Sequence, residues 1–172
     1  MSAYTLVPVE NLRALVASLV GQVCWSATCG GAAGSNLMLD LGRDVPRKRP
    51  VRNRKLSDRQ RHFEGEFRVF IQCAWRLERG TALVCGSGDD PDPSGPMVTS
   101  MEQVENSVVE HAEIQNAGHD LTLRCFEGWV LRIFCDHING DKYDMNYSIT
   151  AGESSLTVGP RGRLEMVNRQ AN

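Results

Sequence analysis

Two short stretches of the chain bring together side chains that could do catalytic chemistry. His111 and Glu113 match half of the signature of zinc nucleobase deaminases, in which the histidine binds zinc and the glutamate transfers protons. The other half of that signature, Pro-Cys-x-x-Cys, does not occur in the sequence. We therefore interpret the two residues as part of a strand and expect no deaminase site.

Cys135 and His137 form the second candidate, a thiol beside an imidazole base. Residues separated by one position point to the same face of a strand, so the two side chains could meet. The alternative is that they lie at the end of a strand, before a turn that begins near Asn139. We favour the turn, and the sequence leaves both interpretations open.

Sites for metals and phosphates need spacings that the chain meets only in part. Cys24 and Cys29 could join distant histidines in a zinc site, but structural zinc usually requires a second close pair of ligands. The acidic loop 86–96 lacks the further ligands and the closing glutamate of an EF-hand. The glycine-rich run 30–35 is not followed by the lysine of a P-loop. We expect neither a metal nor another cofactor.

The most unusual local feature is a basic segment, residues 43–61. It contains nine Lys or Arg residues against two Asp, a balance of +7, so the remaining residues must sum to −9 to give the net charge of −2. Pro46 and Pro50 exclude a continuous helix over its first half. The candidate partner-binding residues belong to this segment and are Arg43, Arg47, Lys48, Arg49, Arg52, Arg54 and Lys55.

Three interpretations of the basic segment stay open. It could lie across the acidic remainder of its own molecule, or it could present a surface to a protein partner. It could also neutralise the phosphates of a nucleic acid through bidentate arginine contacts. Few aromatic residues accompany the cations and no nucleic-acid-binding motif occurs, so we rank nucleic acid last.

The elements that must position these residues begin with one amphipathic helix. Pro8 suits its first turn and Gly21 suits the position just past its end. We expect its apolar face to pack on a sheet rather than on a partner. Ser57 is expected to cap a second, short helical turn. The apolar residues at helical spacing are Leu12, Leu15, Val16, Leu19 and Val20.

Strands make up most of the remaining pattern. Strict alternation predicts one long strand over 67–77 with a single buried face. A left-handed Gly80 would place Leu77 opposite Thr81 in one hairpin, and a left-handed Gly128 would place Cys125 opposite Trp129 in another. Further strands are expected over 23–29, 37–41, 81–85, 109–114, 146–150 and 154–158.

A helix followed by antiparallel strands, without alternation of strands and helices, predicts an α+β fold. We expect the N-terminal amphipathic helix to pack on a mainly antiparallel sheet or a partly open barrel. Hydrophobic residues make up 41% of the 172 residues and charged residues 23%, a balance typical of a globular chain. We predict a single domain, 1–172, with the basic segment 43–61 and the acidic loop 86–96 as exposed insertions and a frayed tail, 168–172.

The cellular compartment is predicted from the strand patterns in which the cysteines lie and from the composition of the N-terminus. Four of the six cysteines fall in apolar strand patterns, where a free thiol behaves as a small buried hydrophobe, so we expect reduced thiols. The N-terminus lacks the basic and apolar regions of a secretory signal, and no apolar run is long enough to cross a membrane. We expect a cytoplasmic protein with no membrane partner, and the sequence does not predict an oligomeric state.

Several short runs resemble a family of short bacterial proteins of unknown function. The resemblance covers roughly 40–164 and implies a bacterial cytoplasmic protein with no established activity. Small families of this kind include immunity proteins encoded beside secreted toxins. Because periodicity places the matching residues in the core, the resemblance supports a fold and not a site. The runs are Gly65–Phe67, Cys73–Glu78, Leu131–Asp136, Asn146–Ser148 and Val158–Pro160.

These observations favour a non-catalytic protein-binding module rather than an enzyme. An immunity-type inhibitor of a toxin, covering its partner's active site with an acidic surface, is the specific form of this hypothesis. The first alternative is a nucleic-acid-associated protein that uses the basic segment 43–61. The second is an enzyme whose site residues converge only in three dimensions.

Overall fold

A computed structural model describes residues 4–140 and 144–168 of the chain. This part contains one open antiparallel sheet of twelve strands and a few short helices, which is the α+β class that the sequence predicts. The strands are β1 (Tyr4–Leu6), β2 (Val23–Thr28), β3 (Leu37–Pro46), β4 (Phe63–Ile71), β5 (Ala74–Arg79), β6 (Ala82–Gly86), β7 (Ser107–Gln115), β8 (Asp120–Cys125), β9 (Trp129–Phe134), β10 (Tyr147–Ala151), β11 (Ser154–Val158) and β12 (Leu164–Asn168). Their order across the sheet is β1-β12-β11-β10-β4-β3-β2-β7-β8-β9-β5-β6.

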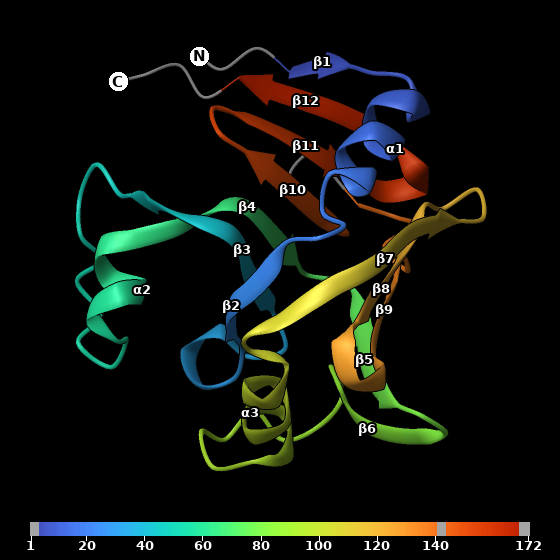
Figure 1. The fold of residues 1–172 in the computed structure, drawn as a ribbon. Helices are drawn as coiled ribbons and strands as arrows, with labels where there is room; N and C mark the ends of the chain where they lie inside the picture. The colour runs from blue at the N-terminus through green and yellow to red at the C-terminus, as the bar shows by residue number, and fades with distance from the viewer. Residues whose placement is uncertain (1–3, 141–143, 169–172) are drawn as a thin grey trace.

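The helices are α1 (Val9–Ala17), α2 (Asp58–His62) and α3 (Pro96–Met101). Helix α1 begins after Pro8, contacts β7 and buries Leu12 and Val16, so the predicted packing of an amphipathic N-terminal helix on the sheet is confirmed. Figure 1 shows α1 beside the β10–β12 part of the sheet, α3 at its other end and α2 standing out beyond β3 and β4. No described helix has the length and hydropathy that a bilayer-spanning segment requires.

The predicted long strand 67–77 is wrong, because the chain changes neighbours between β4 and β5. The N–H groups of Gln72 and Cys73 both donate to the carbonyl oxygen of Asn146, at 2.9 and 3.1 Å. The chain thereby leaves the ladder with β10 and joins the ladder with β9. The alternation continues through this break, and its buried residues are Val69, Ile71, Cys73, Trp75 and Leu77.

The two predicted hairpins have different outcomes. In β8–β9, Cys125 lies opposite Trp129 and Gly128 has a φ of 78°, so this register is confirmed. In β5–β6, Leu77 lies opposite Cys85 and not opposite Thr81, so the predicted register is wrong. The ladder shifts by one residue beside Leu77, and this bulge keeps Cys85 on the buried face.

The tail that the sequence predicts from residue 168 overlaps the end of the last strand. Asn168 closes β12, where it lies opposite Ser154 of β11, and residues 169–172 lie outside the described part of the chain.

Two rows of residues cross five neighbouring strands, one row on each face of the sheet. The apolar row is Ala27, Leu39, Val69, Ile149 and Leu156, all of them buried in the core. The row beside it, which we call the polar row, is Ser26, Asp40, Arg68, Thr150 and Ser155. Because side chains alternate along a strand, the polar row lies on the face opposite the apolar row.

Candidate functional site

The basic segment 43–61 is fixed to the sheet at both ends. Its first residues belong to β3, where Asp44 lies opposite Gly65 of β4. After β3 the backbone N–H of Arg47 donates to His62 at 2.8 Å, and that of Val51 donates to Arg61 at 2.9 Å. The segment is therefore not an insertion over its whole length, since only its middle part leaves regular structure.

Helix α2 begins at the cap that the sequence predicts. The backbone N–H of Gln60 donates to the Ser57 hydroxyl at 3.2 Å, and the Gln60 side chain accepts from the backbone of Ser57 at 3.0 Å. This is a capping box, which satisfies two of the unpaired N–H groups at a helix start. The Gln60 side chain also donates to Ser26 of the polar row at 2.9 Å, so the cap ties α2 to β2.

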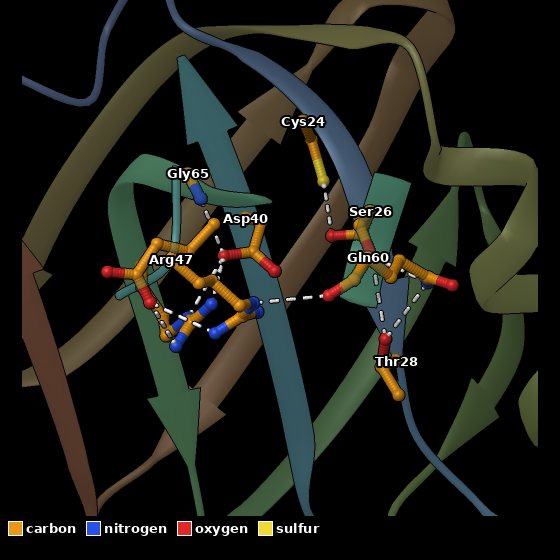
Figure 2. A network of polar contacts seen from close by, with 9 residues as sticks. Cys24, Ser26, Thr28, Asp40, Arg47, Gln60 and Gly65 are labelled. Carbon is orange, nitrogen blue, oxygen red and sulfur yellow. Dashed lines mark hydrogen bonds and ion pairs between the residues drawn. The ribbon is translucent and has the colours of Figure 1, made fainter. Parts of the chain in front are cut away.

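Asp40 is the buried charge beneath the segment, with 5% of its surface exposed. Its Oδ1 accepts from the backbone N–H of Gly65 at 2.8 Å and from Nε of Arg68 at 2.9 Å. The β3–β4 ladder shifts its register between Leu41 and Asp44, and the Asp40 carboxylate takes up the N–H of Gly65 at this irregularity. Figure 2 shows Asp40 directed toward the backbone nitrogen of Gly65.

Arg47 completes this network from the segment side. Its Nη1 lies 3.0 Å from Oε2 of Glu64, and its Nε donates to the carbonyl oxygen of Gln60 at 3.2 Å. Burial lowers the pKa of Arg47, and the charge of Arg68 lowers it further, while Glu64 acts in the opposite direction. Arg47 thus serves to hold the segment against β4.

Three further arginines of the segment lie in ion pairs. The guanidinium of Arg43 lies 2.8 Å from the carboxylate of Glu66, that of Arg59 lies 2.7 Å from Asp44, and that of Arg61 lies 3.3 Å from Asp58. The guanidinium of Arg59 also lies 4.3 Å from the ring centre of Trp25, a cation–π contact. Arg43 and Arg47 thus pair with acidic residues of β4, outside the segment, as the interpretation of a segment docked on its own molecule requires. Arg59 and Arg61 pair with the two aspartates of the segment itself.

The other predicted partner-binding residues have a different environment. All are exposed, and none of them lies in an ion pair with any acidic residue of the described chain. We call the stretch 48–55 the free-cation loop; its cations are Lys48, Arg49, Arg52, Arg54 and Lys55. Of the seven predicted residues, only Arg43 and Arg47 form ion pairs within residues 4–140 and 144–168, so the structure divides the segment into anchoring arginines and exposed cations.

A groove of about 480 Å³ lies beside the free-cation loop. The end of β3 and the first residues of the loop line one side, with Val45, Lys48 and Arg49. The turn between β10 and β11 lines the other side with Glu153, and β4 lies between them because it pairs with both β3 and β10. A volume of this size is typical of small ligand sites.

A second hollow, of about 500 Å³, lies where β2 meets α2 and the short turn after α3. Glu105 lines it and accepts the backbone N–H of Ala27 at 3.0 Å. Cys29 also lines it, but burial raises the pKa of this thiol to about 12. A thiol that stays protonated is a poor nucleophile, so this hollow does not provide an activated cysteine.

The two catalytic candidates from the sequence occupy strands or strand ends. Nε2 of His111 lies 3.6 Å from Oε2 of Glu113 on the exposed side of β7. Cys135 donates through Sγ to the carbonyl oxygen of His119 at 3.5 Å, whereas Nδ1 of His137 lies 3.0 Å from the carbonyl oxygen of Met145. Cys135 and His137 therefore bind different backbone groups and not each other.

The metal candidates are also engaged in local contacts. Cys24 donates to the carbonyl oxygen of Ser26 at 3.5 Å, and Cys29 donates to that of Met97 at 3.7 Å. In the acidic loop 86–96, aspartate oxygens accept backbone N–H groups of the same loop. Within residues 4–140 and 144–168, no three His, Cys, Asp or Glu side chains are grouped so that they could hold a metal ion.

Sequence reasoning missed the partners of the anchoring arginines and the groove. Glu64 and Glu66 alternate with apolar neighbours as ordinary exposed strand residues do, so the sequence carries no sign of their role. Glu153 reaches the groove only because β10 pairs with β4, a contact between segments more than 75 residues apart. The comparisons of the chain with protein families, with curated proteins and with solved structures give no match.

Proposed function

We propose that this protein is a non-catalytic binding protein whose free-cation loop recognises an acidic surface of a protein partner. One observation carries the proposal: exposed cations that form no ion pair with the described residues project from a loop whose flanks are held by the paired side chains of Arg47 and Arg59. Repulsion among like charges disfavours such a cluster unless a partner supplies the opposite charge. Complementary charge also speeds association and restricts the choice of partner.

The attachment of the free-cation loop at both ends supports a role in binding, because it makes the loop an ordered surface and not a flexible solvated segment. Hydrogen bonds of Arg47 and Val51 fix its start and middle, and the capping box at Ser57 fixes its end. A surface that is ordered before binding loses less conformational entropy when the complex forms. The loop can therefore contribute more of its interaction energy to affinity.

A protein partner fits this surface better than a nucleic acid. The free-cation loop contains no aromatic residue on which a base could stack. The residues outside the basic segment sum to −9, and this charge repels a long polyanion. An acidic protein surface needs to contact only the free-cation loop, so its repulsion by the acidic remainder of the chain is smaller.

An immunity-type inhibitor remains the specific form that we propose, with a toxin as the partner. In this proposal the toxin binds the basic loop and not the acidic surface that the sequence predicts, because Asp40, Glu64 and Glu66 are engaged in ion pairs within the molecule.

Affinity capture with quantitative mass spectrometry tests the proposal. The full chain is used as bait in a lysate of its source organism, beside a variant with Ser at Lys48, Arg49, Arg52, Arg54 and Lys55. A matched pair of variants follows: Arg52→Ser with Arg54→Ser, against Arg13→Ser with Arg124→Ser, which removes two exposed cations from α1 and β8.

We expect one stoichiometric protein with the wild type and the α1/β8 control, weaker capture with the matched loop pair, and loss with the five-residue variant. Equal capture by the wild type and the five-residue variant would overturn the proposal. So would a wild type that captures no protein but binds an oligonucleotide with an affinity that falls steeply with salt.

A further inference from the structure

We propose that the groove beside the free-cation loop holds an apolar side chain of the partner, so that the ligand is an acidic peptide segment with one apolar anchor residue. This inference rests on the proposed function and adds the chemistry of the partner. The groove would bind the apolar side chain, and the free-cation loop would attract the acidic residues beside it.

The apolar part of the groove is built at the end of β3. Val45 lines the groove with 40% of its surface exposed, and Pro46 lies next to it. Gly152 also lines the groove, and it carries no side chain that would fill the open space beside it. An apolar side chain that enters would cover Val45 and lose its own contact with water, which is favourable.

The charges around the groove determine which neighbours that apolar residue should have. Two of its acidic residues are already neutralised, because Glu64 pairs with Arg47 and Glu66 pairs with Arg43. Lys48 and Arg49 carry the exposed positive charge on the loop side.

The opposite wall carries a negative charge. Glu153 is exposed there and has no ion pair with the described residues. A bound segment should therefore direct carboxylates toward the loop and present neutral groups to the β10–β11 turn. This arrangement gives the segment a direction as well as a position.

The floor of the groove is rigid enough to discriminate between side chains. Arg68 lies there with 14% of its side chain exposed, held by Asp40 at 2.9 Å and by Glu64 at 3.2 Å. Next to it in the polar row, Thr150 shares a hydrogen bond of 3.0 Å with Ser155. Side chains that are already paired do not move to accommodate a poorly fitting ligand.

Fluorescence anisotropy with two labelled heptapeptides tests the inference. The peptides are Glu-Asp-Glu-Leu-Glu-Asp-Glu and the same sequence with Ser in place of Leu. Burial of one leucine side chain should make the first peptide bind on the order of tenfold more tightly. Val45→Ser should remove that advantage, whereas Val20→Ser, with a similar exposure of 43% in the turn after α1, should preserve it.

Urea unfolding of each variant checks that it is folded. Val45→Thr keeps the shape and strand propensity of valine, so it serves as a second substitution at Val45 if Val45→Ser does not fold. Equal binding of the two peptides, both lost when the five loop cations are changed, would overturn the groove inference and leave the proposed function standing. Peptide binding that survives the change of all five cations would overturn the proposed function itself.

Discussion

Nη2 of Arg68 lies 2.9 Å from Oδ1 of Asp40, and only 14% of the Arg68 side chain and 7% of the Asp40 side chain are exposed to solvent. The two residues lie opposite each other on β4 and β3, in the polar row that Gln60 of the basic segment contacts at Ser26. Removing two charges from water is costly, and the cost is offset only while each charge keeps its partner. This pair therefore ties the position of the basic segment to the stability of the sheet.

Substitution of Asp40 should destabilise the fold strongly. In Asp40→Ala, Arg68 would keep Glu64 but lose its nearest carboxylate, and the N–H of Gly65 would lose its acceptor. We expect the free energy of unfolding in urea to fall by about 3 kcal/mol. Asp58→Ala, whose carboxylate is 92% exposed in its pair with Arg61, should leave that free energy within experimental error. Equal effects of the two substitutions would contradict the role of the buried pair.

Gly65→Ala should also destabilise the protein, for a steric reason. A Cβ atom at Gly65 would lie 2.5 Å from the backbone nitrogen of Leu41 and 2.5 Å from the carbonyl oxygen of Phe67. Because these are backbone atoms, β3 and β4 would have to separate, at a cost of roughly 2 kcal/mol. The control is Gly88→Ala in the loop after β6, where a Cβ meets nothing within 4 Å. If thermal unfolding shifts equally in both variants, the close approach of the strands is not the cause.

The sequence allows the β8–β9 hairpin to be predicted because two independent requirements agree on one register. The apolar residues face each other there only when Gly128 takes the left-handed position. In β5–β6 the same reasoning fails at the turn, because Arg79 pairs with Ala82 around Gly80 and Thr81. The bulge beside Leu77 then shifts the ladder by one more residue and places Cys85 opposite Leu77. The break between β4 and β5 depends on the carbonyl oxygen of Asn146, which lies far away in the sequence.

The candidate site could be predicted only in its composition. The cations of the basic segment were visible in the sequence, but their division into anchors and exposed charges was not. That division depends on Glu64 and Glu66, which reach the segment because β3 and β4 pair across its ends. Non-local strand pairing of this kind leaves no periodicity that a single sequence could reveal.

Glu78 should make stability depend on pH in the acidic range. Its burial favours the neutral form, but Arg132 at 3.0 Å and Arg76 at 2.6 Å outweigh this effect and hold the pKa of Glu78 below its ordinary value of 4.5. A lowered pKa contributes stability above pH 4.5 that is lost as the pH falls through the folded-state value. The difference in unfolding free energy between wild type and Glu78→Gln should therefore be largest above pH 4.5 and shrink below it.

The same comparison in an Arg132→Gln background provides the control for Glu78. Without Arg132 the carboxylate loses a main cause of its lowered pKa, so the pH-dependent part of the difference should become smaller. A difference that instead grows as the pH falls would contradict the account of Glu78.

The cysteines should be largely unreactive until the protein unfolds. Five of the six are buried, and Cys135 is half-buried. Burial raises the pKa of Cys85 and of Cys125 to about 11, so few of these thiols ionise near neutral pH. With Ellman's reagent around pH 8, we expect at most Cys135 to react in the native protein and all six thiols to react in urea. Rapid labelling of several thiols without urea would show that the core opens readily.

The location of the binding surface is the central claim, and amide hydrogen exchange of the wild-type chain, free and bound to its captured partner, tests it most directly. We predict slower exchange in the complex over 47–57, which contains the free-cation loop, and in the β10–β11 turn around Gly152, which lines the groove. Unchanged exchange over 47–57, with protection instead over the acidic loop 86–96, would contradict the claim, because the partner would then bind the acidic loop and not the basic one.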